Sequence, residues 1–85
     1  MDVQEQLYLL KELEVLVSRL DIRVRYEQLT DARSGLCMLK GAAYLIIAAD
    51  SAVEEKLEIF RSILSGWDLS NLYLPPAVRE FLTGD

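Results

Sequence analysis

Hydrophobic positions in the first part of the chain recur with the period of an α-helix. The pattern extends from Val3 to Leu20, and its apolar side chains fill an arc of roughly 180° around the predicted helix. One flat contact with a core needs a stripe of only about 100°. The wide arc therefore predicts either a helix enclosed by two elements of its own domain or a helix partly covered by another subunit.

After this helix the period changes to two residues. Apolar and charged side chains alternate over 21–27, which predicts a strand with one exposed face. Residues 28–34 include Thr, Asp and Ser and predict a loop.

A second strand is predicted at 36–39, opened by Gly35, and a third at 43–47. Lys40 and Gly41 lie between them and predict a tight turn, because glycine adopts positive φ at little cost. The third strand is apolar almost throughout, which is typical of a central strand covered on both faces. One hairpin with one flanking strand is the simplest sheet.

The second helix is predicted by its ends. Ser51 and Glu54 form a capping-box pattern, and Gly66 stands where a left-handed residue commonly ends a helix. Pro76 suits the first turn of a further short helix, predicted at 77–82.

Together these patterns predict one α+β domain over residues 1–85. It contains an amino-terminal helix, a three-stranded and mostly antiparallel sheet, a second helix and a short carboxy-terminal helical turn.

Composition narrows the chemistry available to this domain. The chain has no histidine and one cysteine, so imidazole bases, His-dependent triads and most zinc sites are excluded. A net charge of −5 disfavours nucleic acid as a partner. The longest apolar run, 42–49, is too short to span a membrane. With an acidic amino terminus and an unpaired Cys37, the sequence predicts a cytoplasmic protein without an intrachain disulfide.

The remaining candidate groups have structural interpretations that we favour. Glu54, Glu55 and Glu58 cluster on the second helix, where they could hold a cation but more simply complement the helix dipole. Cys37 is expected to be a buried structural thiol, because no histidine can activate it. We therefore predict no catalytic, cofactor-binding or metal-binding residue.

The function favoured by the sequence is a non-enzymatic protein-interaction or assembly module, with a protein partner or a second copy in a homodimer. Its predicted interface comprises Leu9, Leu13, Leu16, Leu20, Trp67, Tyr73 and Phe81. The alternative is a small-ligand binder or an enzyme that uses carboxylates and the side carrying Arg23, Arg25 and Arg33.

Four segments, 35–41, 44–47, 54–56 and 73–79, together resemble a family of small bacterial proteins with no assigned activity. The most specific of them is the Leu-Pro-Pro-Ala-Val-Arg tail within 73–79. The resemblance covers most of the chain and implies no particular activity.

The hairpin followed by a capped helix is also distantly similar to ImmA/IrrE-type metallopeptidases. In that family an HExxH motif on the helix supplies two zinc ligands and a general base. Ser62, Ile63 and Gly66 stand near those three positions, and none can perform these roles. This resemblance implies a metal-free core that has kept the scaffold without the chemistry.

Overall fold

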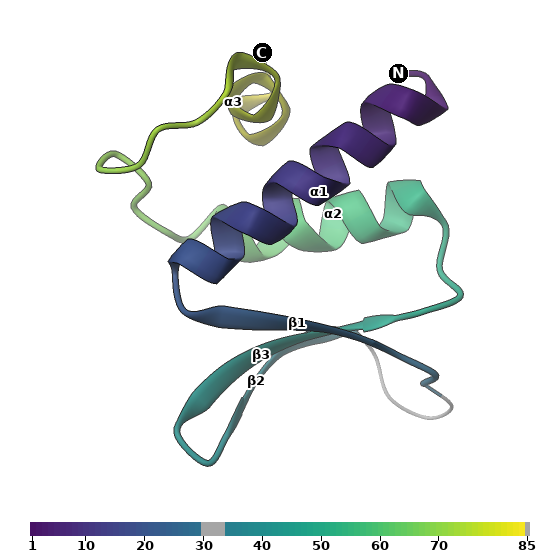
Figure 1. Ribbon diagram of the computed structural model, residues 1–85, viewed down its shortest axis with the longest axis vertical. Coiled ribbons are helices and arrows are strands. Elements are labelled where there is room, and N and C mark those ends of the chain that lie inside the picture. Colours follow the sequence, from purple (N-terminus) through teal and green to yellow (C-terminus); the bar gives the residue numbers. More distant parts are fainter. Residues whose placement is uncertain (30–33, 85) are drawn as a thin grey trace.

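The computed structural model describes residues 1–29 and 34–84. The elements, in chain order, are α1 (Val3–Arg19), β1 (Ile22–Glu27), β2 (Gly35–Leu39), β3 (Ala42–Ala48), α2 (Val53–Leu64) and α3 (Pro76–Thr83). They form two layers, with the helices on one side and the sheet on the other (Figure 1). The predicted α+β architecture is confirmed, with each element at its expected place in the chain.

The sheet has the strand order β1-β3-β2. β3 is central, with β1 parallel to it and β2 antiparallel. The sheet is therefore mixed, and the expectation of a mostly antiparallel sheet is wrong in this detail. The difference arises because β1 pairs with β3 and not with β2.

The core lies between the sheet and the helices. Leu45 and Ile47 on β3 are fully buried, as are Leu13 on α1 and Phe60 on α2. Side chains alternate between the faces of a strand, so these two β3 residues face the helices while their neighbours face the other way. α1 contacts α2, β1 and α3. The wide apolar arc of this helix is thus explained mainly by contacts within its own domain.

The ends of α2 differ from the prediction. The helix begins at Val53 after Ala52, which makes no side-chain capping bond. The Ser51 hydroxyl instead donates to the Ala48 carbonyl at 2.6 Å, so the predicted capping box is wrong. Gly66 does not adopt positive φ, so it is not a left-handed terminator either. The Ser51 hydroxyl therefore stabilises the turn that follows β3 and does not cap α2.

Two terminal features stabilise the outer helices. The Asp2 carboxylate caps α1 by accepting the Glu5 backbone N–H at 2.8 Å. Pro76 occupies the first turn of α3, as predicted, and Gly84 ends it in the left-handed conformation. In the described part of the chain, no helix combines the length and apolar character needed to cross a membrane.

The predicted turn between β2 and β3 is confirmed. Lys40 and Gly41 have φ of 51° and 81°, the two positive values that a two-residue hairpin turn of the most favoured type requires. Gly41 meets this requirement without strain, whereas a side chain at this φ is strained.

Gly41→Ala should therefore lower the free energy of unfolding by about 1 kcal/mol. Gly66→Ala is the matched control, because Gly66 has an ordinary φ and open space around its Cα. Urea unfolding followed by circular dichroism measures both. Equal losses for the two variants would contradict this assignment of the turn.

Candidate functional site

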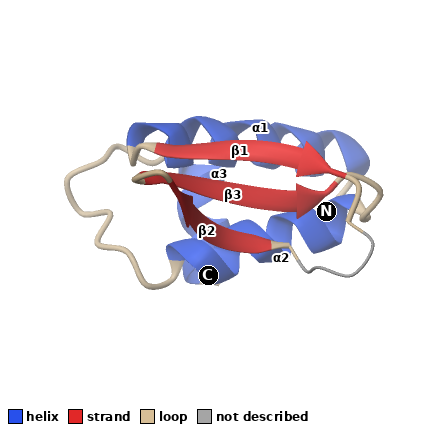
Figure 2. Cartoon of the chain, turned by 90° about the horizontal axis from the view of Figure 1, so that it is seen from below, coloured by secondary structure: helices blue, strands red, loops and turns tan. Residues whose placement is uncertain are grey.

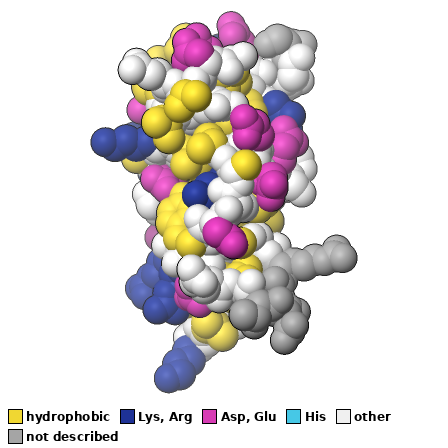
Figure 3. Space-filling view, turned by 90° about the vertical axis from the view of Figure 1, so that its right-hand side faces the viewer, with side chains coloured by type: hydrophobic (Ala, Val, Ile, Leu, Met, Phe, Trp, Pro, Cys, Tyr) yellow, Lys and Arg dark blue, Asp and Glu magenta, His cyan; other side chains and the backbone are white. Residues whose placement is uncertain are grey.

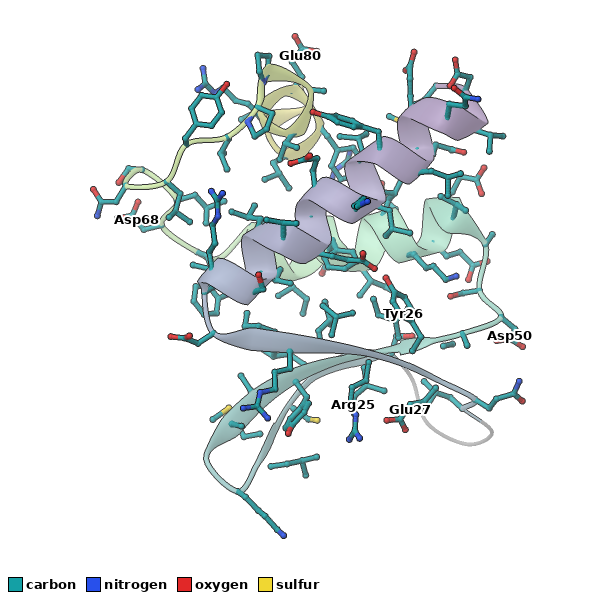
Figure 4. All side chains as sticks on the ribbon, in the orientation of Figure 1. Arg25, Tyr26, Glu27, Asp50, Asp68 and Glu80 are labelled. Atoms are coloured by element: carbon teal, nitrogen blue, oxygen red, sulfur yellow. The ribbon has the colours of Figure 1, made fainter. Side chains whose placement is uncertain are left out.

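One face of the sheet carries no covering layer among the described residues. Figure 2 shows the three strands in front with the helices behind them. Arg25 and Glu27 point away from the helices, whereas Tyr26 between them points toward the helices (Figure 4). The register sets Arg25 beside Ile46 and Glu27 beside Ala48, so these β3 residues share the open face. Within residues 1–29 and 34–84, the expectation that β3 is covered on both faces is not met.

Aromatic and basic side chains meet on this open face. The guanidinium carbons of Arg23 and Arg25 lie 5.8 and 5.4 Å from the centre of the Tyr44 ring. Arg23 Nη1 donates to the Tyr44 hydroxyl at 3.2 Å, and Arg25 Nε lies 3.6 Å from the Glu27 carboxylate. The sequence grouped Arg23 and Arg25 with Arg33, which lies outside the described residues. The two described arginines are exposed and lie beside the Tyr44 ring, and Arg25 also lies beside the Glu27 carboxylate.

The edge strand β2 exposes large apolar side chains on both of its faces. Leu36, Met38 and Leu39 are 42%, 65% and 47% exposed. Leu36 and Met38 pair with the helix-facing Leu45 and Ala43 and so point to the helical side. Leu39 points to the open face. No residue of β2 carries a charge, although proteins commonly protect free strand edges with charged side chains.

A surface hollow lies on the helical side of β2. It has a volume of about 970 Å³. Its apolar lining residues include Leu20, Ile22, Leu36, Met38, Ala43 and Trp67, and its polar ones include Glu14, Ser18, Asp21 and Arg23. The hollow therefore places a mixed concave surface beside the unpaired edge, with apolar side chains nearest to β2.

Most of the interface residues predicted from the sequence are not available on the surface. Leu9, Leu13, Leu16 and Phe81 belong to the buried core, and that part of the prediction is wrong. The amphipathic pattern identified apolar positions correctly but could not show which layer covers them. Leu20 is partly buried against the same core.

Arg61 of α2 covers the buried Phe81 side chain of α3. Its guanidinium carbon lies 4.1 Å from the centre of the Phe81 ring, and its Nε donates to the Phe81 carbonyl at 3.1 Å. Nη1 also pairs with Glu58 at 2.7 Å. This one side chain joins α2 to α3 and covers the aromatic ring expected at an interface.

Trp67 and Tyr73 are the two predicted residues that remain exposed, at 40% and 70%. They line different hollows, Trp67 beside β2 and Tyr73 beside the carboxy-terminal half of α1. They therefore do not form one patch. The β2 residues, which the sequence interpretation did not select, could have been found from the absence of charge in 35–39.

The carboxylates of α2 lie on its exposed side. The Glu54 carboxylate accepts from Gln6 Nε2 at 3.2 Å. Its pKa is lowered, chiefly by a hydrogen bond from its own backbone N–H and secondarily by Gln6. Figure 3 shows many of the acidic side chains over the helical layer, with basic side chains among them and further basic side chains toward the sheet. Across the residues described, no cluster of three or more Cys, Asp and Glu side chains is arranged to hold a metal ion.

Cys37 pairs with Tyr44 and so lies on the open face. It is half-buried rather than fully buried, which corrects the expectation of a buried thiol.

The positions compared with a metallopeptidase helix are likewise not assembled on one helix. Ser62 is exposed, Ile63 packs against the core and Gly66 lies beyond the end of α2.

Tyr26 makes a polar contact that sequence reasoning did not identify. Its hydroxyl donates to the Glu14 carboxylate on α1, and Lys56 Nζ lies 5.4 Å from its ring centre. Burial raises the pKa of Tyr26 most strongly, and the hydrogen bond to Glu14 and that residue's negative charge raise it further. The contact joins the edge of β1 to both long helices.

Because the pKa of Tyr26 is raised in the folded state, its contribution to stability is complete below about pH 10 and falls as the pH rises further. An ultraviolet titration of phenolate should show Tyr26 ionising last. Tyr26→Phe should remove this last step and weaken the alkaline loss of stability, whereas the exposed Tyr73→Phe should leave both in place. A last step that persists in Tyr26→Phe would contradict the assignment.

No protein family, no curated protein and no solved structure matches this chain.

Proposed function

We propose that this protein is a non-enzymatic interaction module that pairs the free edge of strand β2 with another protein chain. The observation that carries the proposal is the edge of β2, an uncharged strand with three exposed large side chains. Half of the backbone N–H and C=O groups of an edge strand point outward and can pair with an added strand.

The energetics of such pairing favour a protein partner. Each backbone hydrogen bond made across the edge contributes a net of about 0.5–1.5 kcal/mol, and apolar side chains add about 25 cal/mol per Å² buried. Leu36 and Met38 lie beside the 970 Å³ hollow, so an added strand gains apolar contacts as well as backbone bonds. With a net charge of −5, the chain offers little to nucleic acid or to an acidic bilayer.

The enzymatic alternative has less support from the geometry. Arg23 and Arg25 lie on the open face of the sheet, whereas the carboxylates of α2 lie in the helical layer. The sheet separates these two groups, and the carboxylate that shares the open face with the arginines is that of Glu27, which pairs with Arg25. We further propose that the module works in the cytoplasm, because a single thiol such as that of Cys37 stays reduced there.

Site-specific photo-crosslinking in living cells tests this function. The photoreactive residue benzoylphenylalanine at position 38 should give a discrete covalent adduct, because Met38 is exposed at the edge. The same residue at Glu55, on the exposed side of α2, is the matched control and should give none. Adding Leu36→Lys to the position-38 chain should remove the adduct by placing a charge on the edge.

Circular dichroism of each variant verifies that the domain remains folded. Absence of an adduct at position 38, or equal adducts at both positions, would contradict the proposed function.

A further inference from the structure

Resting on the proposed function, we propose that the chain joined to β2 is a second copy of this protein. The two β2 strands pair antiparallel about Cys37, so that two three-stranded sheets become one sheet of six strands.

The two edges differ in how they tolerate self-pairing. Antiparallel pairing of β1 about Arg25 sets two Arg25 side chains opposite each other, and pairing about Val24 sets Arg23 against Arg25. Like charges directly opposite one another destabilise a strand pair. β2 contains no charged residue, so its pairing with a copy meets no such repulsion.

The length of β2 selects the register. Its residues run from Gly35 to Leu39, and a pairing centred on Cys37 places all of them opposite a partner residue. Moving the centre to Leu36 or Met38 leaves residues at one end of the strand without a partner. The register centred on Cys37 therefore makes the greatest number of strand contacts.

This register also sets complementary side chains opposite one another. On the helical side, Leu36 of each copy lies opposite Met38 of the other, and both are exposed in the single chain. On the open side, Leu39 lies opposite Gly35, where a Cβ would meet nothing within 4 Å. A large side chain thus faces an unfilled position, and the pairing occurs twice by symmetry.

The hollow beside β2 provides room for the second copy. Met38 is the most exposed residue of β2, and with Leu36 it borders the hollow that extends to Trp67. The two-fold axis brings the Met38 and Leu36 side chains of the second copy to the same side of the sheet. Apolar surface on each copy is then covered by apolar surface on the other.

The predicted contact is small. Five paired residues extend about 17 Å at about 3.4 Å per residue, which places the interface at the lower end of specific contacts. We therefore expect a reversible dimer with a dissociation constant on the order of micromolar.

Cys37 is the single cysteine of the chain and makes the pairing directly testable. Opposed residues of an antiparallel pair have Cβ atoms about 4.5–5.5 Å apart, a separation that the shortest bis-methanethiosulfonate crosslinker spans. The purified full chain at high micromolar concentration should give a covalent dimer with this reagent. Dilution to low micromolar concentration should reduce the yield several-fold.

Four variants complete the test. Cys37→Ser with Ser62→Cys moves the thiol to an exposed position on α2 and should crosslink at least ten-fold less. Met38→Asp should abolish the Cys37 dimer through charge at the edge, and Leu36→Lys should do the same if Met38→Asp fails to fold. Arg25→Asp, which changes the other edge, should crosslink as the parent chain does.

Equal crosslinking through residues 37 and 62 would overturn the dimer, and so would a dimer that survives both edge charges in folded protein. The mass of the photo-crosslinked adduct at position 38 distinguishes failure of the homodimer from failure of the proposed function. An adduct with twice the mass of the chain supports the homodimer. An adduct of another mass retains the interaction module but excludes the second copy as its partner.

Discussion

The structure depends on the burial of β3 against the helical layer. This strand is paired along both edges, and its Leu45 and Ile47 are fully buried against a core that includes Phe60. Among the described residues, the helices cover one face of the sheet and no element covers the other. The surface that we assign to partner binding lies at the border between these two faces, along the free edge of β2.

The two edge strands expose side chains of different kinds. β1 carries Arg23, Arg25 and Glu27 on its open side, and its Tyr26 is held to α1 by Glu14. β2 has no charge and projects Leu36 and Met38 beside the hollow. Charge thus protects one edge from unwanted pairing, while the other edge keeps the properties that favour an added strand.

Local patterns predicted the elements well because they depend on residues close in sequence. The helical period predicted the end of α1 to within one residue of the observed end, and Lys40 with Gly41 predicted the hairpin turn. The β1–β3 pairing and the burial of Phe81 depend on contacts between distant segments, which one sequence pattern does not encode. The cap at Ser51 failed because its hydroxyl had a competing carbonyl at Ala48. In the sequence, the β2 surface appeared only as a segment without charged residues. That this segment forms a free edge follows from the strand order, which the sequence pattern did not show.

Amide hydrogen exchange shows whether β2 is the edge used for association. If it is, the backbone amides of 35–39 that point away from β3 exchange slowly at high micromolar protein and rapidly after dilution. The amides along the outer edge of β1 exchange at the same rate at both concentrations. Protection that does not change with concentration, or that appears on β1 instead, would contradict the account.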